Sequence, residues 1–345
     1  MASNKGLNTA KAGKKDEFYT QLTDIEKELK HYTAFFKGKT VLCNCDDPRV
    51  SNFFRYFALN FKRLGLKKLI TTCYKNQNPD LFSDYTTDKA VSLVYDGSLD
   101  ITTLESLESI PTVPLRGNGS YDSPECVELL EQADVVVTNP PFSLFGEYVS
   151  FLIKHNKKFL IIGNINSIAT QSIFPLFADN KIWLGISIHS GDRVFNVPDY
   201  YPLKASGCGI DADGKKWIKV KGVRWFTNID NQQRHEPFIS YQSYKPELYP
   251  KLDNFDAIFV KNTVDIPSDY NDVMCVPITF LDKYNPDEFE IVAFNRDADG
   301  TLSVFPYGTG AIPTGTLLNP MLKERPYLKG KRLFSRLLIR RKQTN

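Results

Sequence analysis

The sequence lacks the features of membrane, secreted and disulfide-bonded proteins. No apolar run approaches the length that crosses a bilayer, and no hydrophobic segment follows the N-terminal lysines to make a signal peptide. We therefore expect a cytoplasmic protein that makes no contact with a membrane. The six cysteines are scattered without a C-x-x-C pair or neighbouring His, so the spacing predicts no zinc site, no other metal site and no disulfide framework.

Internal repeats and low-complexity segments are also missing. The 345 residues, of which 42% are hydrophobic and 24% charged, have the composition of an ordinary globular protein. The length suffices for one large domain or two moderate ones. We expect one main domain with a dependent second lobe.

Positive charge is concentrated at the two ends of the chain. Residues 1–15 carry four lysines and no acid, and residues 323–345 carry nine Lys or Arg against the single Glu324, although the formal net charge is only +3. The chain between the ends is therefore acidic. Basic ends on an acidic body suit a polyanion such as nucleic acid, whose phosphates attract Lys and Arg whatever the base sequence. Solvated tails that improve solubility are the alternative.

Strand and helix patterns alternate over the first half of the chain. Apolar runs predict strands at residues 40–43, 69–72, 91–95, 134–138, 158–162 and 182–188. Helical spacing predicts helices over residues 21–36, 50–64, 148–156 and 167–179, with the aromatic stripe Phe53, Phe57 and Phe61 facing the core. This alternation predicts an α/β fold with a Rossmann-like, doubly wound, mostly parallel sheet covered on both faces. Ligands of such sheets bind at the carboxyl ends of the strands.

The pattern changes from about residue 190 to short strands that are rich in aromatics and punctuated by Gly, Pro and Asp. We predict three parts: a flexible basic arm over residues 1–15, an α/β domain over residues 16–189, and a mixed or β-rich lobe over residues 190–345 that ends in a basic tail. Because aromatics are more often packing residues than base-stacking ones, none of those after residue 190 is assigned a contact.

The most informative segment is Asn139-Pro140-Pro141-Phe142, directly after the apolar run at residues 135–138. An exocyclic amine on a conjugated ring is a poor nucleophile, so a catalyst must aim hydrogen-bond acceptors at its two hydrogens. The Asn139 side-chain carbonyl supplies one acceptor and the Pro140 backbone carbonyl another. The prolines fix the loop, and Phe142 offers a flat face for a base. A proline turn that merely ends the strand is the alternative interpretation.

This loop and four further segments resemble the EcoRI-type DNA adenine-N6 methyltransferases, which use S-adenosylmethionine. The five segments are residues 16–21, 43–54, 134–145, 158–168 and 276–281. The resemblance reaches from residue 16 to about residue 290. It implies methyl transfer to N6 of an adenine that is swung out of duplex DNA, with residues 139–142 as the catalytic loop. It also implies that residues 16–189 are the catalytic domain that binds S-adenosylmethionine, and that the lobe over residues 190–345 recognises the DNA target.

The same resemblance implies a set of cofactor-binding residues. Phe18, Tyr19 and Thr20 are expected to hold the methionine end of S-adenosylmethionine, and the turn Asn44-Cys45-Asp46-Asp47-Pro48 to lie against the cofactor. Asp46 or Asp47 can pair with its ammonium group. Asp47-Pro48 can equally begin the next helix, and the two roles are compatible.

Two positions depart from the family pattern. The predicted second strand ends at Thr72-Cys73-Tyr74 without an acidic residue for the ribose hydroxyls, so that role is unassigned. Where the family has Gly-Asp-Phe, this chain has Gly119-Ser120-Tyr121. Ser120 is the candidate acceptor for the cofactor's adenine amine, and Asp122 can substitute from two positions on.

The resemblance implies double-stranded DNA as the partner of a monomeric modification enzyme. It admits a cognate restriction endonuclease that acts on the same site without forming a stable complex. Methylation of an RNA adenine or of a glutamine amide in a protein remains an alternative. A DNA-binding module that keeps the fold but has lost catalysis is another.

Overall fold

The structure is a computed structural model of the chain. It describes residues 18–45, 47–74, 90–101, 103–170, 172–197, 201–203, 207–253, 255–295, 297–298, 301–302, 327–333 and 336–343. The predicted basic arm and Asp46 lie outside the described residues. The chain divides into two compact units, Met1–Ser167 with Gly185–Ile229 and Ile168–Leu184 with Asp230–Asn345. The functional division near residue 190 stays a prediction.

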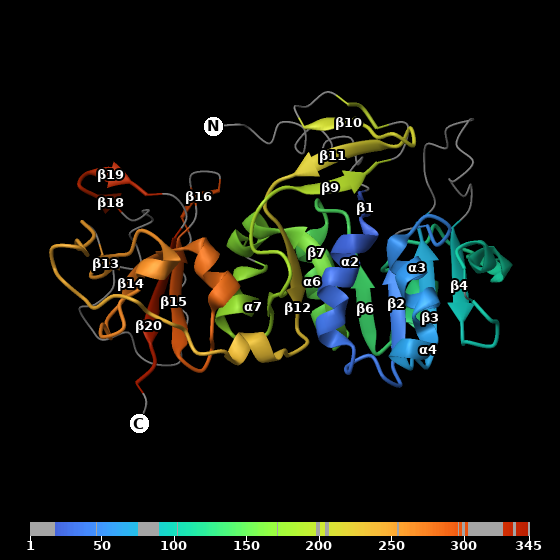
Figure 1. Ribbon diagram of the computed structural model, residues 1–345, viewed down its shortest axis with the longest axis horizontal. Coiled ribbons are helices and arrows are strands. Elements are labelled where there is room, and N and C mark those ends of the chain that lie inside the picture. The colour runs from blue at the N-terminus through green and yellow to red at the C-terminus, as the bar shows by residue number, and fades with distance from the viewer. Residues whose placement is uncertain are drawn as a thin grey trace. The chain divides into compact units, whose positions relative to one another are not determined.

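The first unit is built on a large sheet with strands in the order β5-β4-β3-β2-β6-β7-β12 (Figure 1). The strands are β2 (Thr40–Asn44), β3 (Lys68–Cys73), β4 (Val91–Tyr95), β5 (Thr112–Pro114), β6 (Val135–Thr138), β7 (Lys158–Asn164) and β12 (Val223–Thr227). Strands β3, β2, β6 and β7 run parallel, whereas β4, β5 and β12 pair antiparallel to their neighbours. A mixed α/β fold is confirmed, but within this sheet parallel pairing is confined to β3, β2, β6 and β7.

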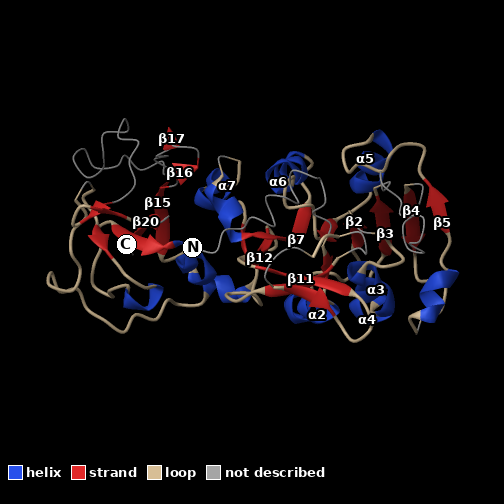
Figure 2. Cartoon of the chain, turned by 90° about the horizontal axis from the view of Figure 1, so that it is seen from above, coloured by secondary structure: helices blue, strands red, loops and turns tan. Residues whose placement is uncertain are grey.

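Helices cover both faces of this sheet. They are α2 (Leu22–Leu29), η1 (Lys30–Tyr32), α3 (Asn52–Leu59), α4 (Phe61–Leu64), η2 (Glu105–Ser109), α5 (Pro124–Glu131), α6 (Phe145–Lys154) and η3 (Ile165–Ala169). Helices α5 and α6 lie on one side and α2, α3 and α4 on the other (Figure 2). Covering on both faces explains why β6 is buried at every position, and it agrees with the predicted layers.

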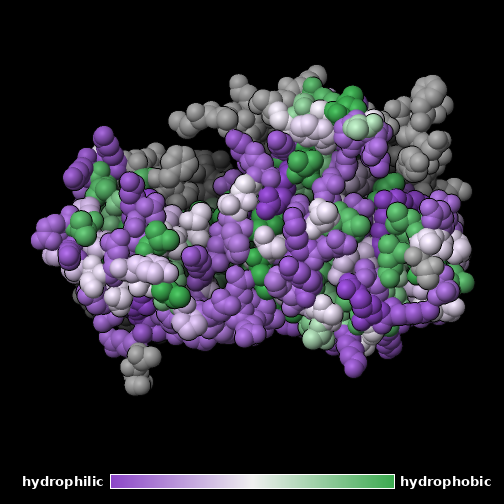
Figure 3. Space-filling model, viewed as in Figure 1, coloured by the Kyte–Doolittle hydropathy of each residue, from purple (hydrophilic) through white to green (hydrophobic). Residues whose placement is uncertain are grey.

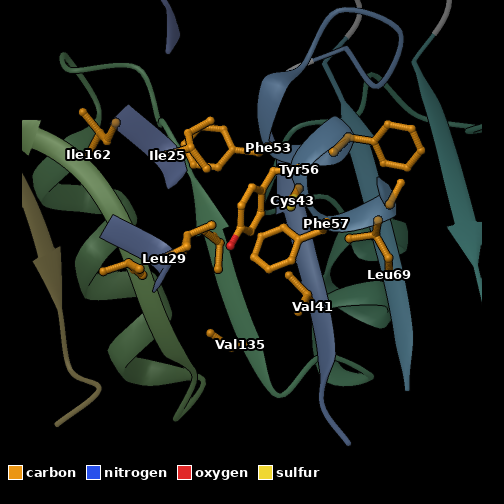
Figure 4. Close-up of a cluster of buried hydrophobic side chains, with 14 of the residues drawn as sticks. Ile25, Leu29, Val41, Cys43, Phe53, Tyr56, Phe57, Leu69, Val135 and Ile162 are labelled. Atoms are coloured by element: carbon orange, nitrogen blue, oxygen red, sulfur yellow. The ribbon is translucent and has the colours of Figure 1, made fainter. Parts of the chain in front are cut away.

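The core of the first unit is an aromatic cluster between helices and strands. Phe53 and Phe57 of α3 lie with Val41 of β2 and Leu69 of β3 (Figure 4). The predicted stripe is therefore confirmed as core, since Phe53, Phe57 and Phe61 are all buried. Burying one such side chain contributes about 1.5–3 kcal/mol.

A smaller antiparallel sheet also belongs to the first unit. Its strands are β1 (Tyr19–Thr20), β9 (Arg193–Asn196), β11 (Lys216–Val220) and β10 (Cys208–Ile210), in that order. Phe195 and Ile218 occupy paired positions on β9 and β11, and both are buried in the core of this unit. Strand β1 carries residues that the sequence assigns to the cofactor.

The predicted strand at residues 182–188 was wrong beyond Leu184. The backbone N–H groups of Ile186 and Ser187 donate to the carboxylate of Glu28, at 2.8 and 2.6 Å. Glu28 is fully buried and also accepts from the Tyr32 hydroxyl at 3.1 Å. The buried carboxylate therefore takes the donors that a continued strand would use in its ladder.

The second unit contains short elements and a four-stranded sheet in the order β13-β14-β20-β15. Its elements are α7 (Phe174–Ala178), β8 (Trp183–Leu184), η4 (Gln232–His235), β13 (Ile258–Phe259), η5 (Thr263–Asp265), β14 (Met274–Pro277), η6 (Ile278–Lys283), β15 (Phe289–Asn295), β16 (Asp297–Ala298), β17 (Thr301–Leu302), β18 (Tyr327–Leu328), β19 (Lys331–Arg332) and β20 (Arg336–Arg341). The predicted change to short strands is visible in this unit, and the predicted helix at residues 167–179 is reduced to part of η3 and α7.

Part of the predicted basic tail is an internal strand. Strand β20 lies between β14 and β15 in the sheet. Arg336 donates to the Val260 carbonyl at 2.7 Å, and Arg340 pairs with Glu290 at 2.5 Å. These guanidinium groups therefore take part in the packing of the second unit.

No helix of the described residues is both long and apolar enough to span a bilayer. On the face seen in Figure 3, hydrophobic residues form small separate groups among hydrophilic ones.

Candidate active site

The loop at residues 139–142 leaves the carboxyl end of β6, a central parallel strand of the large sheet. Val136 and Val137, which point to opposite faces of β6, are both fully buried, so the strand that delivers the loop is packed on both faces. After the loop, the Leu144 N–H donates to the Pro141 carbonyl at 3.0 Å, and α6 begins at Phe145. This edge is the position at which parallel sheets bind their ligands.

The side chain of Asn139 is oriented by the backbone of Phe18. Its Nδ2 donates to the Phe18 carbonyl at 2.6 Å, and the side chain is only 6% exposed. Its Oδ1 is buried and has no hydrogen-bond partner among the described residues. The opposite amide orientation would set Oδ1 against a carbonyl oxygen, so the geometry leaves an acceptor, and not a donor, without a partner. A buried acceptor without a partner calls for a ligand or a functional explanation.

Phe142 packs into an aromatic cluster beside this loop. Its ring lies 5.5 Å from that of Phe18 and 6.4 Å from that of Phe195, nearly perpendicular to both. Only 6% of the residue is exposed. The structure therefore brings Phe142 together with Phe18 and Asn139, and its stacking on a base stays a prediction.

Phe18 and strand β1, which follows it, alternate in burial. Phe18 and Thr20 are buried, whereas Tyr19 between them is half-buried. The Thr20 carbonyl accepts from Asn52 Nδ2 at 2.7 Å, but the buried Thr20 hydroxyl has no partner among the described residues. Thr20 Oγ1 and Asn139 Oδ1 are thus two polar atoms near Phe18 that a polar ligand can satisfy.

The turn after β2 is tied to the two elements that flank the catalytic loop. The Asn44 carbonyl accepts from the hydroxyl of Thr138, the last residue of β6. Asn44 Oδ1 accepts from the Tyr148 hydroxyl of α6 at 2.5 Å. Cys45 follows with a left-handed φ of 78°. The predicted cofactor turn therefore lies beside the end of β6.

The rest of this segment forms a turn before helix α3. Asp47 Oδ1 accepts from the Arg49 N–H at 2.8 Å, and the Asp47 carbonyl accepts from the Ser51 N–H at 2.8 Å. Pro48 is buried. Helix α3 itself begins at Asn52, where the Ser51 hydroxyl caps it by accepting from the Phe54 N–H at 3.4 Å. Asp47-Pro48 therefore precede the helix without capping it, and their role towards the cofactor stays a prediction.

Ser120 lies beside the carboxyl end of β3. Gly119 has φ of +76°, and a Cβ added there would lie 2.2 Å from the Cys73 carbonyl oxygen, so only glycine fits this approach. The Ser120 hydroxyl donates to Asp122 Oδ1 at 2.5 Å, which leaves its lone pairs as acceptors. Ser120 and Asp122 therefore act as one hydrogen-bonded pair.

The sequence predicted no role for Tyr148 or Asn52, and it did not predict the hydrogen bond from Asn139 to the Phe18 carbonyl. Tyr148 lies in a predicted helix, and its burial raises the pKa of its hydroxyl well above the ordinary value of 10, so it remains a donor at neutral pH. Nothing in the spacing of these residues signals the contacts. Among the described residues, no group of three or more His, Cys, Asp and Glu could hold a metal ion.

Comparison with known proteins identifies the family. A family model described as adenine-specific methyltransferase EcoRI matches residues 6–342. The chain belongs to this family. The resemblance inferred from five short segments is therefore confirmed over almost the whole chain.

Three curated relatives of this EcoRI family cover most of the chain. The Type II methyltransferase M.EcoRI of Escherichia coli is 47% identical over 311 residues, which are 86% of this chain and 91% of that protein. M.MpnI of Mycoplasma pneumoniae is 37% identical over 98% of each chain. M.MgeORF184P of Mycoplasma genitalium is 35% identical over 98% of this chain and 99% of its own.

A solved structure of a putative RNA methyltransferase from Pyrococcus horikoshii is 13% identical and covers 62% of this chain and 88% of that one. Its TM-score of 0.31 is too low to argue from. Membership of the EcoRI family itself implies a methyl donor. The unpaired Thr20 hydroxyl and the Ser120–Asp122 pair, both at the edge that carries the catalytic loop, fit a polar donor molecule.

Proposed function

We propose that the protein transfers a methyl group from S-adenosylmethionine to N6 of an adenine at a specific sequence in duplex DNA. The observation that carries this proposal is Asn139 Oδ1, a buried acceptor without a partner among the described residues. The bond from Asn139 Nδ2 to Phe18 fixes its direction. An acceptor oriented in this way suits an amine whose hydrogens must be held while charge develops. The Type II methyltransferase names of the relatives support a modification enzyme.

In this proposal the target adenine leaves the base stack, because N6 is paired inside the duplex. Asn139 Oδ1 and the Pro140 carbonyl accept the two N6 hydrogens, and Phe142 stacks on the extruded ring while Pro141 holds the loop. No strong base is needed, since the N6 hydrogens become acidic once the methyl group has been transferred, and one of them then leaves as a proton. Positioning and directed hydrogen bonds therefore provide most of the rate acceleration.

S-Adenosylmethionine supplies a methyl group on a positively charged sulfur atom. We assign its binding to Phe18, Tyr19, Thr20, the turn Asn44-Cys45-Asp46-Asp47-Pro48, and Ser120. The buried, unpaired hydroxyl of Thr20 supports this assignment, as does the position of Ser120 at the end of β3. The large sheet then serves as a Rossmann-like methyltransferase sheet, whose strands all come from residues 16–189 except β12, and residues 190–345 recognise the target.

Duplex DNA is the proposed partner, bound by a monomer. Because Arg336, Arg340, Arg341 and Lys342 are all held by partners within the second unit, we assign the phosphate contacts to the other basic residues of the two chain ends. A cognate restriction endonuclease would act on the same site without forming a stable complex.

A methyl-transfer assay with tritiated S-adenosylmethionine tests this function. Duplex DNA, RNA and total protein are offered in parallel, and the methylated products are digested and identified. We expect label in DNA alone, as N6-methyladenine. Label in RNA or in glutamine would overturn the substrate, and binding of DNA without any transfer would favour an inactive DNA-binding module.

A further inference from the structure

Tyr148 lies under the candidate site without belonging to any motif in the sequence. It is on the first turns of α6 and is fully buried. Its hydroxyl donates to Asn44 Oδ1 at 2.5 Å, across 104 residues of sequence. A short bond between two buried neutral groups fixes the side chain of Asn44 at the end of β2.

The ring of Tyr148 makes a second contact with a different candidate segment. The ring of Tyr121 lies 5.0 Å away at an interplanar angle of 87°, an edge-to-face pair. Tyr121 directly follows Ser120, which the family resemblance assigns to the adenine end of the cofactor. The Tyr148 side chain therefore contacts two segments that are predicted to bind the methyl donor: the turn after β2, through Asn44, and the Ser120 segment, through Tyr121.

Asn44 also connects this contact to the catalytic loop. Its carbonyl accepts from the Thr138 hydroxyl, and Thr138 directly precedes Asn139. Thr138 lies before the loop and Tyr148 lies after it, so the two residues that hold Asn44 flank the loop along the chain. A shift of the donor turn relative to the loop must break at least one of these bonds.

We propose that Tyr148 is a positioning residue that sets the place of the methyl donor relative to the catalytic loop, through Asn44 and the Ser120 segment. The proposal rests on the proposed function. Its physical basis is that transfer needs the reacting atoms about 3–3.5 Å apart and in line, and a misplacement of about 1 Å can lower the rate 10²-fold. Tyr148 itself touches neither donor nor adenine in this proposal.

The test compares Tyr148→Phe with Tyr95→Phe. The first substitution removes only the oxygen that binds Asn44. The control removes a partly buried hydroxyl of the last residue of β4, which donates to the Leu99 carbonyl at 2.8 Å. Binding of S-adenosylhomocysteine is measured by calorimetry, which needs no turnover, and kcat is measured with saturating DNA.

We expect Tyr148→Phe to weaken binding of S-adenosylhomocysteine by up to about tenfold, because binding must then order Asn44 at a cost of up to the free energy of the lost hydrogen bond, and to lower kcat. We expect Tyr95→Phe to leave both unchanged. Wild-type affinity and kcat in Tyr148→Phe, or equal losses in the two variants, would overturn the proposal.

A second variant tests the proposal independently, in case Tyr148→Phe does not fold. Tyr121→Leu keeps the bond from Tyr148 to Asn44 and removes the ring contacts of Tyr121 with Tyr148 and Phe151, so we again expect weaker binding of S-adenosylhomocysteine. Unchanged binding in this variant would show that the ring contact has no positioning role. If the wild-type protein binds S-adenosylhomocysteine but methylates no DNA, the proposed function fails while the binding comparison still decides the role of Tyr148.

Discussion

Replacing Asn139 with Ala separates catalysis from folding. The substitution removes Oδ1, the acceptor that we assign to an N6 hydrogen, and also the Nδ2 bond to the Phe18 carbonyl. Loss of one preorganised catalytic hydrogen bond lowers kcat by about 10²–10³-fold. Leaving a buried carbonyl without its partner lowers the free energy of unfolding by about 1–3 kcal/mol. We therefore expect a folded protein that still binds DNA and barely methylates it.

The matched control is Asn52→Ala. Asn52 Nδ2 donates to the Thr20 carbonyl at 2.7 Å, so its loss removes the same kind of bond from a backbone carbonyl two residues after Phe18. Urea unfolding should show similar destabilisation of the two variants, while single-turnover methylation should fall steeply in Asn139→Ala and only slightly in Asn52→Ala. Near-normal turnover of Asn139→Ala would refute the reasoning.

Three further predictions follow from contacts of single residues. Gly119→Ala should weaken donor binding in calorimetry, because its Cβ would meet a carbonyl oxygen at 2.2 Å. Glu28→Ala should lower the free energy of unfolding in urea by about 3 kcal/mol, because two backbone N–H groups lose their acceptor; an unchanged midpoint would contradict this. Hydrogen bonds to Asp287 and Asp230 raise the pKa of His235 above its ordinary value of 6.5. Its stabilising contribution is therefore full below that value and is lost as the pH rises through the raised pKa, so urea midpoints of wild type and His235→Gln should converge at alkaline pH.

Local patterns predicted the elements of the first unit better than their pairing. The aromatic stripe of α3 and the strand β6 follow from spacing alone, because one face of the helix and both faces of the strand are buried. The strand at residues 91–95 was also predicted, but its antiparallel pairing with β3 was not. Strand direction depends on the path of the connecting chain, which the apolar pattern of the strand does not contain.

The end of the predicted strand at residues 182–188 shows a different limit. Its apolar residues suit a buried strand, yet the N–H groups of Ile186 and Ser187 bind Glu28 instead. The competing acceptor lies about 160 residues earlier in the chain, at separations of 158 and 159. A prediction from the apolar pattern of a short segment cannot include a partner so far away in the sequence.

The candidate site was predictable where the chemistry lies in one segment. Asn139 and its prolines form a contiguous loop whose residue types suit one reaction, and the family match agrees with that interpretation. The orientation of Asn139 was not predictable, since its partner Phe18 is 121 residues away. The prediction of a basic C-terminal tail was wrong in part, because Arg340 is bound to Glu290 within a sheet. A count of charges does not distinguish such an Arg from a solvated one.

The most direct test is to express wild type and Asn139→Ala in cells without adenine methylation and to sequence their DNA with detection of modified bases. We expect N6-methyladenine at one recurring sequence motif in cells with the wild-type protein and none in cells with the variant. Methylation by both proteins, or an unmodified genome in cells that contain folded wild-type protein, would contradict the role proposed for Asn139 in adenine methylation.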